Sequence, residues 1–108
     1  MSQITAQDAY DRRDEVQFLD VREPMEWVAG HIDGAIHIPM AQLRDDREVL
    51  AKDRTIVCVC RSGHRSAAVT VALTRAGLDA VNLVGGMQEW AGLKLPFISE
   101  GDQDPYVA

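Results

Sequence analysis

Residues 55–77, TIVCVCRSGHRSAAVTVALTRAG, decide the fold of this chain. The first five form a continuous apolar run, which predicts a buried strand near the centre of a sheet. Residues 65–76 predict a helix that is apolar around most of its circumference and therefore largely buried. The short segment between them contains a glycine and predicts a tight loop. Cys60 should then stand at the carboxyl end of the central strand, where open α/β sheets bind ligands.

Strands and helices alternate on either side of this stretch. We expect further strands over residues 16–21, 35–38 and 81–84. We expect helices over residues 5–13 and 24–29, one short helix within 40–50, and a last helix beginning at residue 87. Strands that are separated by helices predict a mostly parallel sheet with helices on both faces, an α/β fold.

The 108 residues predict one domain over residues 1–98, followed by a polar, acidic C-terminal tail over residues 99–108 that packs loosely. The net charge of −6 argues against nucleic acid and acidic membranes as partners. No apolar run approaches the roughly 20 residues that a membrane span needs. The N-terminus lacks the basic and apolar regions of a secretory signal, so we expect a cytoplasmic protein.

Cys60 is the candidate nucleophile. Backbone N–H groups of its loop and the positive end of the following helix favour a thiolate, the reactive form of cysteine. We expect Cys58 to be a core residue and both cysteines to be reduced thiols. We expect no metal site, because there is no second cysteine pair and the three histidines lack zinc-type spacing. No other cofactor is expected.

The six residues after Cys60 are candidates for binding a small anionic substrate. Arg61 and Arg65 would hold its charged end. Gly63 suits a loop position that has a positive φ or no room for a Cβ. The remaining candidates are polar: Ser62 and Ser66 for side-chain hydrogen bonds, with helix capping as an alternative for Ser66, and His64 as a pocket-lining residue.

One acidic and one basic residue lie at the end of the strand over residues 16–21, near the same edge of the sheet. Asp20 and Arg22 are expected to form an ion pair that braces the loop, ahead of any direct role in catalysis.

Four segments resemble signatures of the rhodanese (sulfurtransferase) family, and they occur in the family's order. They are Leu19–Glu23 (LDVRE), Gly30–Pro39 (GHIDGAIHIP), Cys60–Ser66 (CRSGHRS) and Gly85–Trp90 (GGMQEW). The likeness spans residues 4–96 and indicates a stand-alone, single-domain member. It implies a five-stranded parallel sheet and a persulfide intermediate on Cys60.

The resemblance implies a thiosulfate sulfurtransferase. Sulfur would pass from thiosulfate or a related anionic donor, through Cys60, to cyanide in an assay or to a thiol in the cell. A persulfide carrier or redox-sensing module for a partner protein is an alternative. A phosphatase or arsenate reductase is a weaker alternative, because only four residues separate Cys60 from Arg65, and family members that act on phosphate resemble a loop that is one residue longer.

Overall fold

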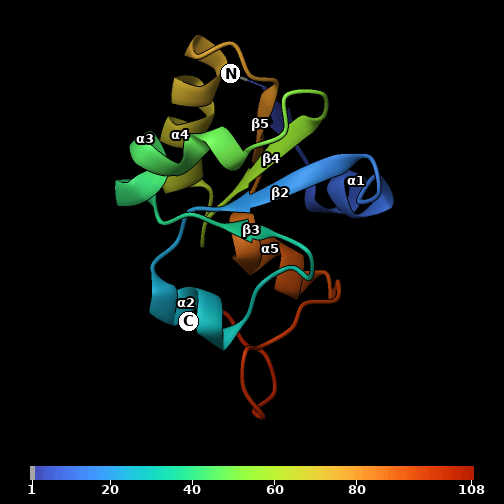
Figure 1. Cartoon of the computed structure of the whole chain (residues 1–108). Helices are drawn as coiled ribbons and strands as arrows, with labels where there is room; N and C mark the ends of the chain where they lie inside the picture. The colour runs from blue at the N-terminus through green and yellow to red at the C-terminus, as the bar shows by residue number, and fades with distance from the viewer. Residues whose placement is uncertain (1) are drawn as a thin grey trace.

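The computed structural model describes residues 2–108 and shows a five-stranded sheet with helices on both faces (Figure 1). Spatial order in the sheet is β1-β5-β4-β2-β3, and every neighbouring pair of strands is parallel. The bounds of the strands are β1 Gln3–Ile4, β2 Val16–Asp20, β3 Ile36–His37, β4 Thr55–Val59 and β5 Ala80–Leu83. The predicted α/β class, the parallel sheet and the central position of the strand over residues 55–59 are confirmed.

Within residues 2–108, five α-helices and two short 3₁₀ helices lie between these strands or after the last of them. The α-helices are α1 Ala6–Asp11, α2 Pro24–Ala29, α3 Leu43–Asp46, α4 His64–Arg75 and α5 Gly86–Gly92, and the 3₁₀ helices are Met40–Gln42 and Arg47–Val49. Figure 1 shows α1 and α5 on one side of the sheet and α3 and α4 on the other. Within residues 2–108, no helix has both the length and the apolar character needed to cross a bilayer.

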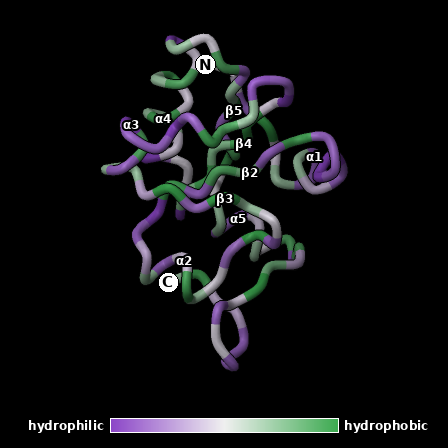
Figure 2. Tube along the Cα trace, viewed as in Figure 1, coloured by the Kyte–Doolittle hydropathy of each residue, from purple (hydrophilic) through white to green (hydrophobic). Residues whose placement is uncertain are grey.

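Alternate residues of β4 supply the two halves of the core. Val57 and Val59 pack in the cluster beneath α1 and α5, whereas Ile56 and Cys58 pack in the cluster beneath α3 and α4. Successive side chains of a strand point to opposite faces, so a sheet that is covered on both faces needs an uninterrupted apolar strand at its centre. Figure 2 shows this apolar centre in the strands and polar segments around the periphery.

The structure departs from the predicted elements where the local signal is weak. Strand β1 was not predicted, because two residues carry no periodicity and their pairing with β5 alone defines the strand. Residues 40–49 form three short helical segments in succession, where we expected one short helix and a loop. The first helix ends at Asp11, two residues before the predicted end. Thr5 caps its start by accepting a hydrogen bond from Asp8 N at 3.1 Å.

The C-terminal segment folds back along α2 instead of packing loosely. Its residue Ile98 forms an antiparallel bridge with His31, and Tyr106 N donates to the carbonyl of Ala29 at 3.1 Å. The carboxylate of Glu100 lies 2.7 Å from Nε2 of His31. The division of the chain at residue 98 stays a prediction, but these contacts bring residues 98–108 to the carboxyl edge of the sheet.

Candidate active site

Cys60 lies at the base of a short loop between β4 and α4, as predicted, and only 1% of the residue is exposed. The loop turns sharply at Gly63, the residue before α4, which has a φ of 104°. This left-handed conformation is strained for residues with a Cβ, so the turn requires glycine. The turn wraps the loop's backbone around the sulfur of Cys60.

Hydrogen-bond donors from Gly63 and Ser66 surround the sulfur. The backbone N–H groups of Gly63 and Ser66 donate to Cys60 Sγ at 3.1 and 3.3 Å, and the hydroxyl oxygen of Ser66 lies 3.2 Å from it. Hydrogen bonds to a charged group stabilise the charged form. The loop is therefore built to hold a negative sulfur.

The first turn of helix α5 orients the loop's backbone through two hydrogen bonds. The N–H groups of Met87 and Gln88 donate to the carbonyls of Cys60 and Arg61 at 2.9 and 3.0 Å. Carbonyl and N–H point in opposite directions across a planar peptide, so these bonds leave the loop's N–H groups free to face the sulfur. The close approach needs glycine at residue 86, where a Cβ would lie 2.7 Å from the carbonyl carbon of Arg61.

The two cysteines have opposite acidities. Burial raises the pKa of Cys60, but hydrogen bonds from the Ser66 side chain and from the backbone of Ser66, Gly63 and Ser62 outweigh it, so the pKa falls below the ordinary 9.0. Burial dominates at Cys58 and raises the pKa of that thiol to about 11. Cys60 is therefore the more readily ionised of the two thiols.

Alkylation should report this difference directly. We expect the rate of iodoacetamide addition to Cys60 to rise with pH, with a midpoint below 9.0, because only the thiolate reacts and its folded pKa is lowered. Peptide mapping should find Cys58 unmodified while the protein is folded. A midpoint at or above that of free cysteine, with Cys60 as the modified residue, would contradict the stabilised thiolate.

Asn82 is a site residue that the sequence analysis missed. It is buried on β5, its Nδ2 donates to the carbonyl of Gly63 at 3.1 Å, and its Oδ1 accepts a hydrogen bond from the hydroxyl of Ser66. It therefore links the loop's turn to the hydroxyl beside the sulfur. Ser66 lies within α4 and takes part in this network, so the alternative role of helix cap is wrong. An amide inside an apolar strand was the signal available in the sequence.

Removal of this brace should weaken both the fold and the thiolate. Asn82→Ala removes one of the two donors to the Gly63 carbonyl and the acceptor for the Ser66 hydroxyl, which should lower the free energy of unfolding by about 1–3 kcal/mol. Iodoacetamide should also react more slowly with Cys60 at pH 7. Urea unfolding and alkylation kinetics measure the two effects, with Val81→Thr on the same strand as the control. An unchanged alkylation rate in Asn82→Ala would mean that Asn82 serves stability alone.

Arg61 of the loop and Arg65 of the first turn of α4 both have hydrogen-bond partners within the protein. Arg65 makes a two-pronged ion pair with Glu26 of α2, from Nη1 to Oε1 at 2.8 Å and from Nη2 to Oε2 at 2.9 Å. The hydrogen bonds from Arg65 lower the pKa of Glu26, and the same bonds raise the pKa of Arg65. Arg61 is exposed, and its Nε donates to the backbone oxygen of Ala108 at 3.0 Å. Nothing in the sequence near Glu26 signals its pairing with Arg65.

The polar residues of the loop's outer side contact each other. Ser62 Oγ lies 3.1 Å from Nδ1 of His64, and this pair faces away from the core. The structure thus brings Ser66 and Gly63 to the sulfur, while Ser62 and His64 interact with each other at the rim.

Asp20 and Arg22 form the predicted ion pair, which is completely buried. Arg22 Nη2 lies 2.7 Å from Asp20 Oδ2 and also donates to the carbonyl of Gly30 at 2.7 Å. These hydrogen bonds tie β2 to the end of α2. They do not reach the Cys60 loop directly, so the pair supports the loop only through α2, which carries Glu26.

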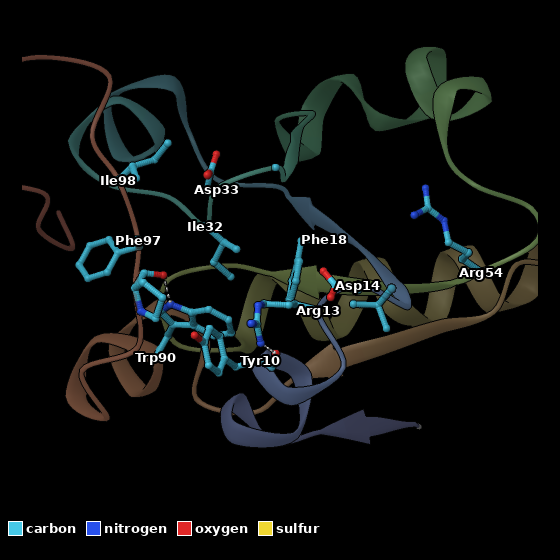
Figure 3. Close-up of a pocket in the computed structure, with 13 residues that line it drawn as sticks. Tyr10, Arg13, Asp14, Phe18, Ile32, Asp33, Arg54, Trp90, Phe97 and Ile98 are labelled. Carbon is cyan, nitrogen blue, oxygen red and sulfur yellow. Dashed lines mark hydrogen bonds between the residues drawn. The ribbon is translucent and has the colours of Figure 1, made fainter.

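A cavity of about 570 Å³ lies away from Cys60, between α1, α5 and the segment over residues 96–98 (Figure 3). Tyr10, Phe18 and Trp90 form its aromatic wall, and none of residues 60–66 lines it. Across residues 2–108, no three histidine, cysteine, aspartate or glutamate side chains gather as metal ligands would.

Comparison with known proteins identifies a family for this chain. The family model "Rhodanese-like domain" matches residues 5–93. YtwF of Bacillus subtilis, provisionally assigned as a sulfurtransferase, is 41% identical over 83 residues, which cover 77% of this chain and 81% of YtwF. A sulfurtransferase of Allochromatium vinosum is 36% identical over 87 residues, which cover 80% of this chain and 81% of the relative.

A solved structure has the same fold. The crystal structure of a rhodanese-related protein from Thermoplasma volcanium superimposes with a TM-score of 0.88 at 36% identity, and the match covers 91% of this chain and 98% of that one. With the family model matched from residue 5 to residue 93, and with Cys60 held in a loop of N–H donors at the carboxyl edge of a parallel sheet, this chain belongs to the rhodanese-like domain family.

Proposed function

We propose that this protein transfers a sulfane sulfur from a donor such as thiosulfate to a thiophilic acceptor, through a persulfide on Cys60. The observation that carries the proposal is the set of donors on Cys60 Sγ, the N–H groups of Gly63 and Ser66 and the hydroxyl of Ser66. Such a cradle stabilises a thiolate before the reaction and an anionic persulfide after it.

The first half-reaction loads the enzyme. The Cys60 thiolate attacks the outer sulfur of thiosulfate, a new S–S bond forms, and the S–S bond of the donor breaks. Sulfite leaves with the electron pair of the broken bond. The sulfur carries its negative charge into the loop, where the backbone of residues 61–66 surrounds it. Arg61 and Arg65 are the candidates for holding the sulfonate end of the donor.

The second half-reaction unloads the enzyme. A thiophilic acceptor, cyanide in an assay or a thiol in the cell, attacks the terminal sulfur of the persulfide and restores the Cys60 thiolate. Because the sulfur rests on the enzyme between two separate reactions, ping-pong kinetics are expected. Ser62 and His64 lie at the rim of the loop and are candidates for contact with the acceptor.

Mass spectrometry of the intact protein tests this function. Brief exposure to thiosulfate should add the mass of one sulfur atom, and cyanide should then remove it and release thiocyanate. Sulfur that loads onto Cys60 but turns over slowly with cyanide or small thiols would identify a persulfide carrier for a partner protein. A protein that takes up no sulfur from thiosulfate or from any persulfide donor would contradict sulfur transfer.

A further inference from the structure

The ion pair between Arg65 and Glu26 changes the charge that an incoming donor meets. Arg65 lies in the first turn of α4, directly after the loop that holds Cys60, but both Nη groups donate to the carboxylate of Glu26 at 2.8 and 2.9 Å. The Glu26 side chain is only 12% exposed and the Arg65 side chain 37%, so water screens this pair less than a surface pair. The positive charge of Arg65 is therefore matched before any substrate binds.

Glu26 is held in this position by its own helix. Its Oε1 also accepts a hydrogen bond from the backbone N–H of Glu23 at 3.0 Å, which closes the first turn of α2. Pro24 begins that helix, and the buried Arg22 anchors the helix end through the carbonyl of Gly30. The carboxylate is thus a rigid part of the site and cannot simply swing aside for an anion.

Other charges near the loop are also paired or exposed to solvent. Asp20 and Arg22 neutralise each other in the core. Arg61 keeps its charge but is exposed and donates to the oxygen of Ala108, so its attraction for an anion is weakened by solvent. A thiosulfate dianion would have to approach a thiolate and the Glu26 carboxylate with little net positive charge to offset the repulsion.

We infer that Glu26 is a specificity-determining residue, which disfavours dianionic donors and directs the site toward thiol persulfides that carry a single charge or none. This inference rests on the proposed function and narrows its donor class. The loading step is then attack of the Cys60 thiolate on the outer sulfur of R–S–SH. The S–S bond of the donor breaks, the outer sulfur and its proton move to Cys60, and R–S⁻ leaves with the electron pair of that bond.

Removal of the negative charge at residue 26 provides the test. Glu26→Gln keeps an oxygen that can accept from Glu23 N and from Arg65, but it removes the negative charge. Rates of sulfur loading onto Cys60 would be measured by intact mass with three donors: thiosulfate, a dianion; methanethiosulfonate, a monoanion with the same reacting sulfur; and 2-hydroxyethyl persulfide. Glu23→Gln is the matched control, since it removes a neighbouring charge that does not contact Arg65.

The wild-type protein should load fastest from 2-hydroxyethyl persulfide and slowest from thiosulfate. Coulomb energy scales with the charge of the donor, so Glu26→Gln should raise kcat/KM about tenfold for thiosulfate and about threefold for methanethiosulfonate. The gain should appear as a lower KM. Glu26→Asp, which keeps the charge, should retain the wild-type order of donors, and Glu23→Gln should change the three rates little.

Two outcomes overturn the inference alone: equal changes for all three donors in Glu26→Gln, or a wild-type preference for thiosulfate, with sulfur still loading onto Cys60. If Cys60 takes up sulfur from none of the three donors in any variant, the proposed function itself fails.

Discussion

Replacement of Cys60 by serine should abolish sulfur transfer. A serine hydroxyl is barely ionised at neutral pH and cannot form a persulfide, so kcat/KM should fall at least about a thousandfold. The structure gives no reason for this substitution to unfold the protein, because oxygen can accept the hydrogen bonds that Gly63 and Ser66 donate to the sulfur. The measurement is the rate of thiocyanate formation together with the intact mass after exposure to a sulfur donor.

Cys58→Ser is the matched control for this prediction. Cys58 is two residues away on the same face of β4, completely buried, and its pKa is raised to about 11, so it should not act as a nucleophile. Most activity should survive, with some loss of stability from a hydroxyl placed in the core. Equal loss of activity in the two variants, with folding intact, would contradict the assignment of the nucleophile.

A large loss of stability is expected when Arg22 is replaced by methionine. The substitution leaves the carboxylate of Asp20 buried without its partner, and breaking a buried ion pair in this way typically costs about 3–5 kcal/mol. The carbonyl of Gly30 also loses its donor at the end of α2. Urea or thermal unfolding followed by circular dichroism measures the change.

The double variant Asp20→Val, Arg22→Met separates the ion pair from simple packing. Replacement of both partners by apolar side chains removes the unpaired charge, so it should recover part of the loss seen in Arg22→Met. Nη1 of Arg22 finds no hydrogen-bond partner among residues 2–108, so the native pair is itself not fully satisfied. A double variant that is less stable than Arg22→Met would contradict this expectation. It would show that the hydrogen bonds of the ion pair stabilise the fold by more than burial of its two charges destabilises it.

Much of the fold follows from local sequence. The apolar run Thr55–Val59 can be buried on both faces only at the centre of a sheet that is covered on both sides. Thr5 and Pro24 mark the starts of two helices, Thr5 by capping and Pro24 by its fixed φ. The cysteine directly after the central strand and the glycine three residues later together predict a nucleophile in a tight loop. These features depend on residues that are close along the chain, which is why the sequence reveals them.

Only the tertiary structure identifies which residues contact the Cys60 loop and Arg65. Asn82 reaches the loop from β5, and Glu26 reaches Arg65 across 39 positions of sequence. Strand β1 exists only because β5 offers it an edge. Helix α2 ends at Ala29 as predicted, and the φ of 176° at the next residue, Gly30, is ordinary extended backbone. Glycine is needed there because a Cβ would lie 2.6 Å from the carbonyl oxygen of Tyr106.

The sequence by itself thus predicted a reactive cysteine at residue 60 and determined the parallel α/β architecture and the order of its main elements, because propensity, apolar periodicity and caps act over a few residues. Only the tertiary structure decided which charge Arg65 presents to a substrate and where residues 98–108 lie. Both depend on contacts between segments that are distant in sequence, such as α2 with α4 and His31 with Glu100, and no local pattern encodes those contacts.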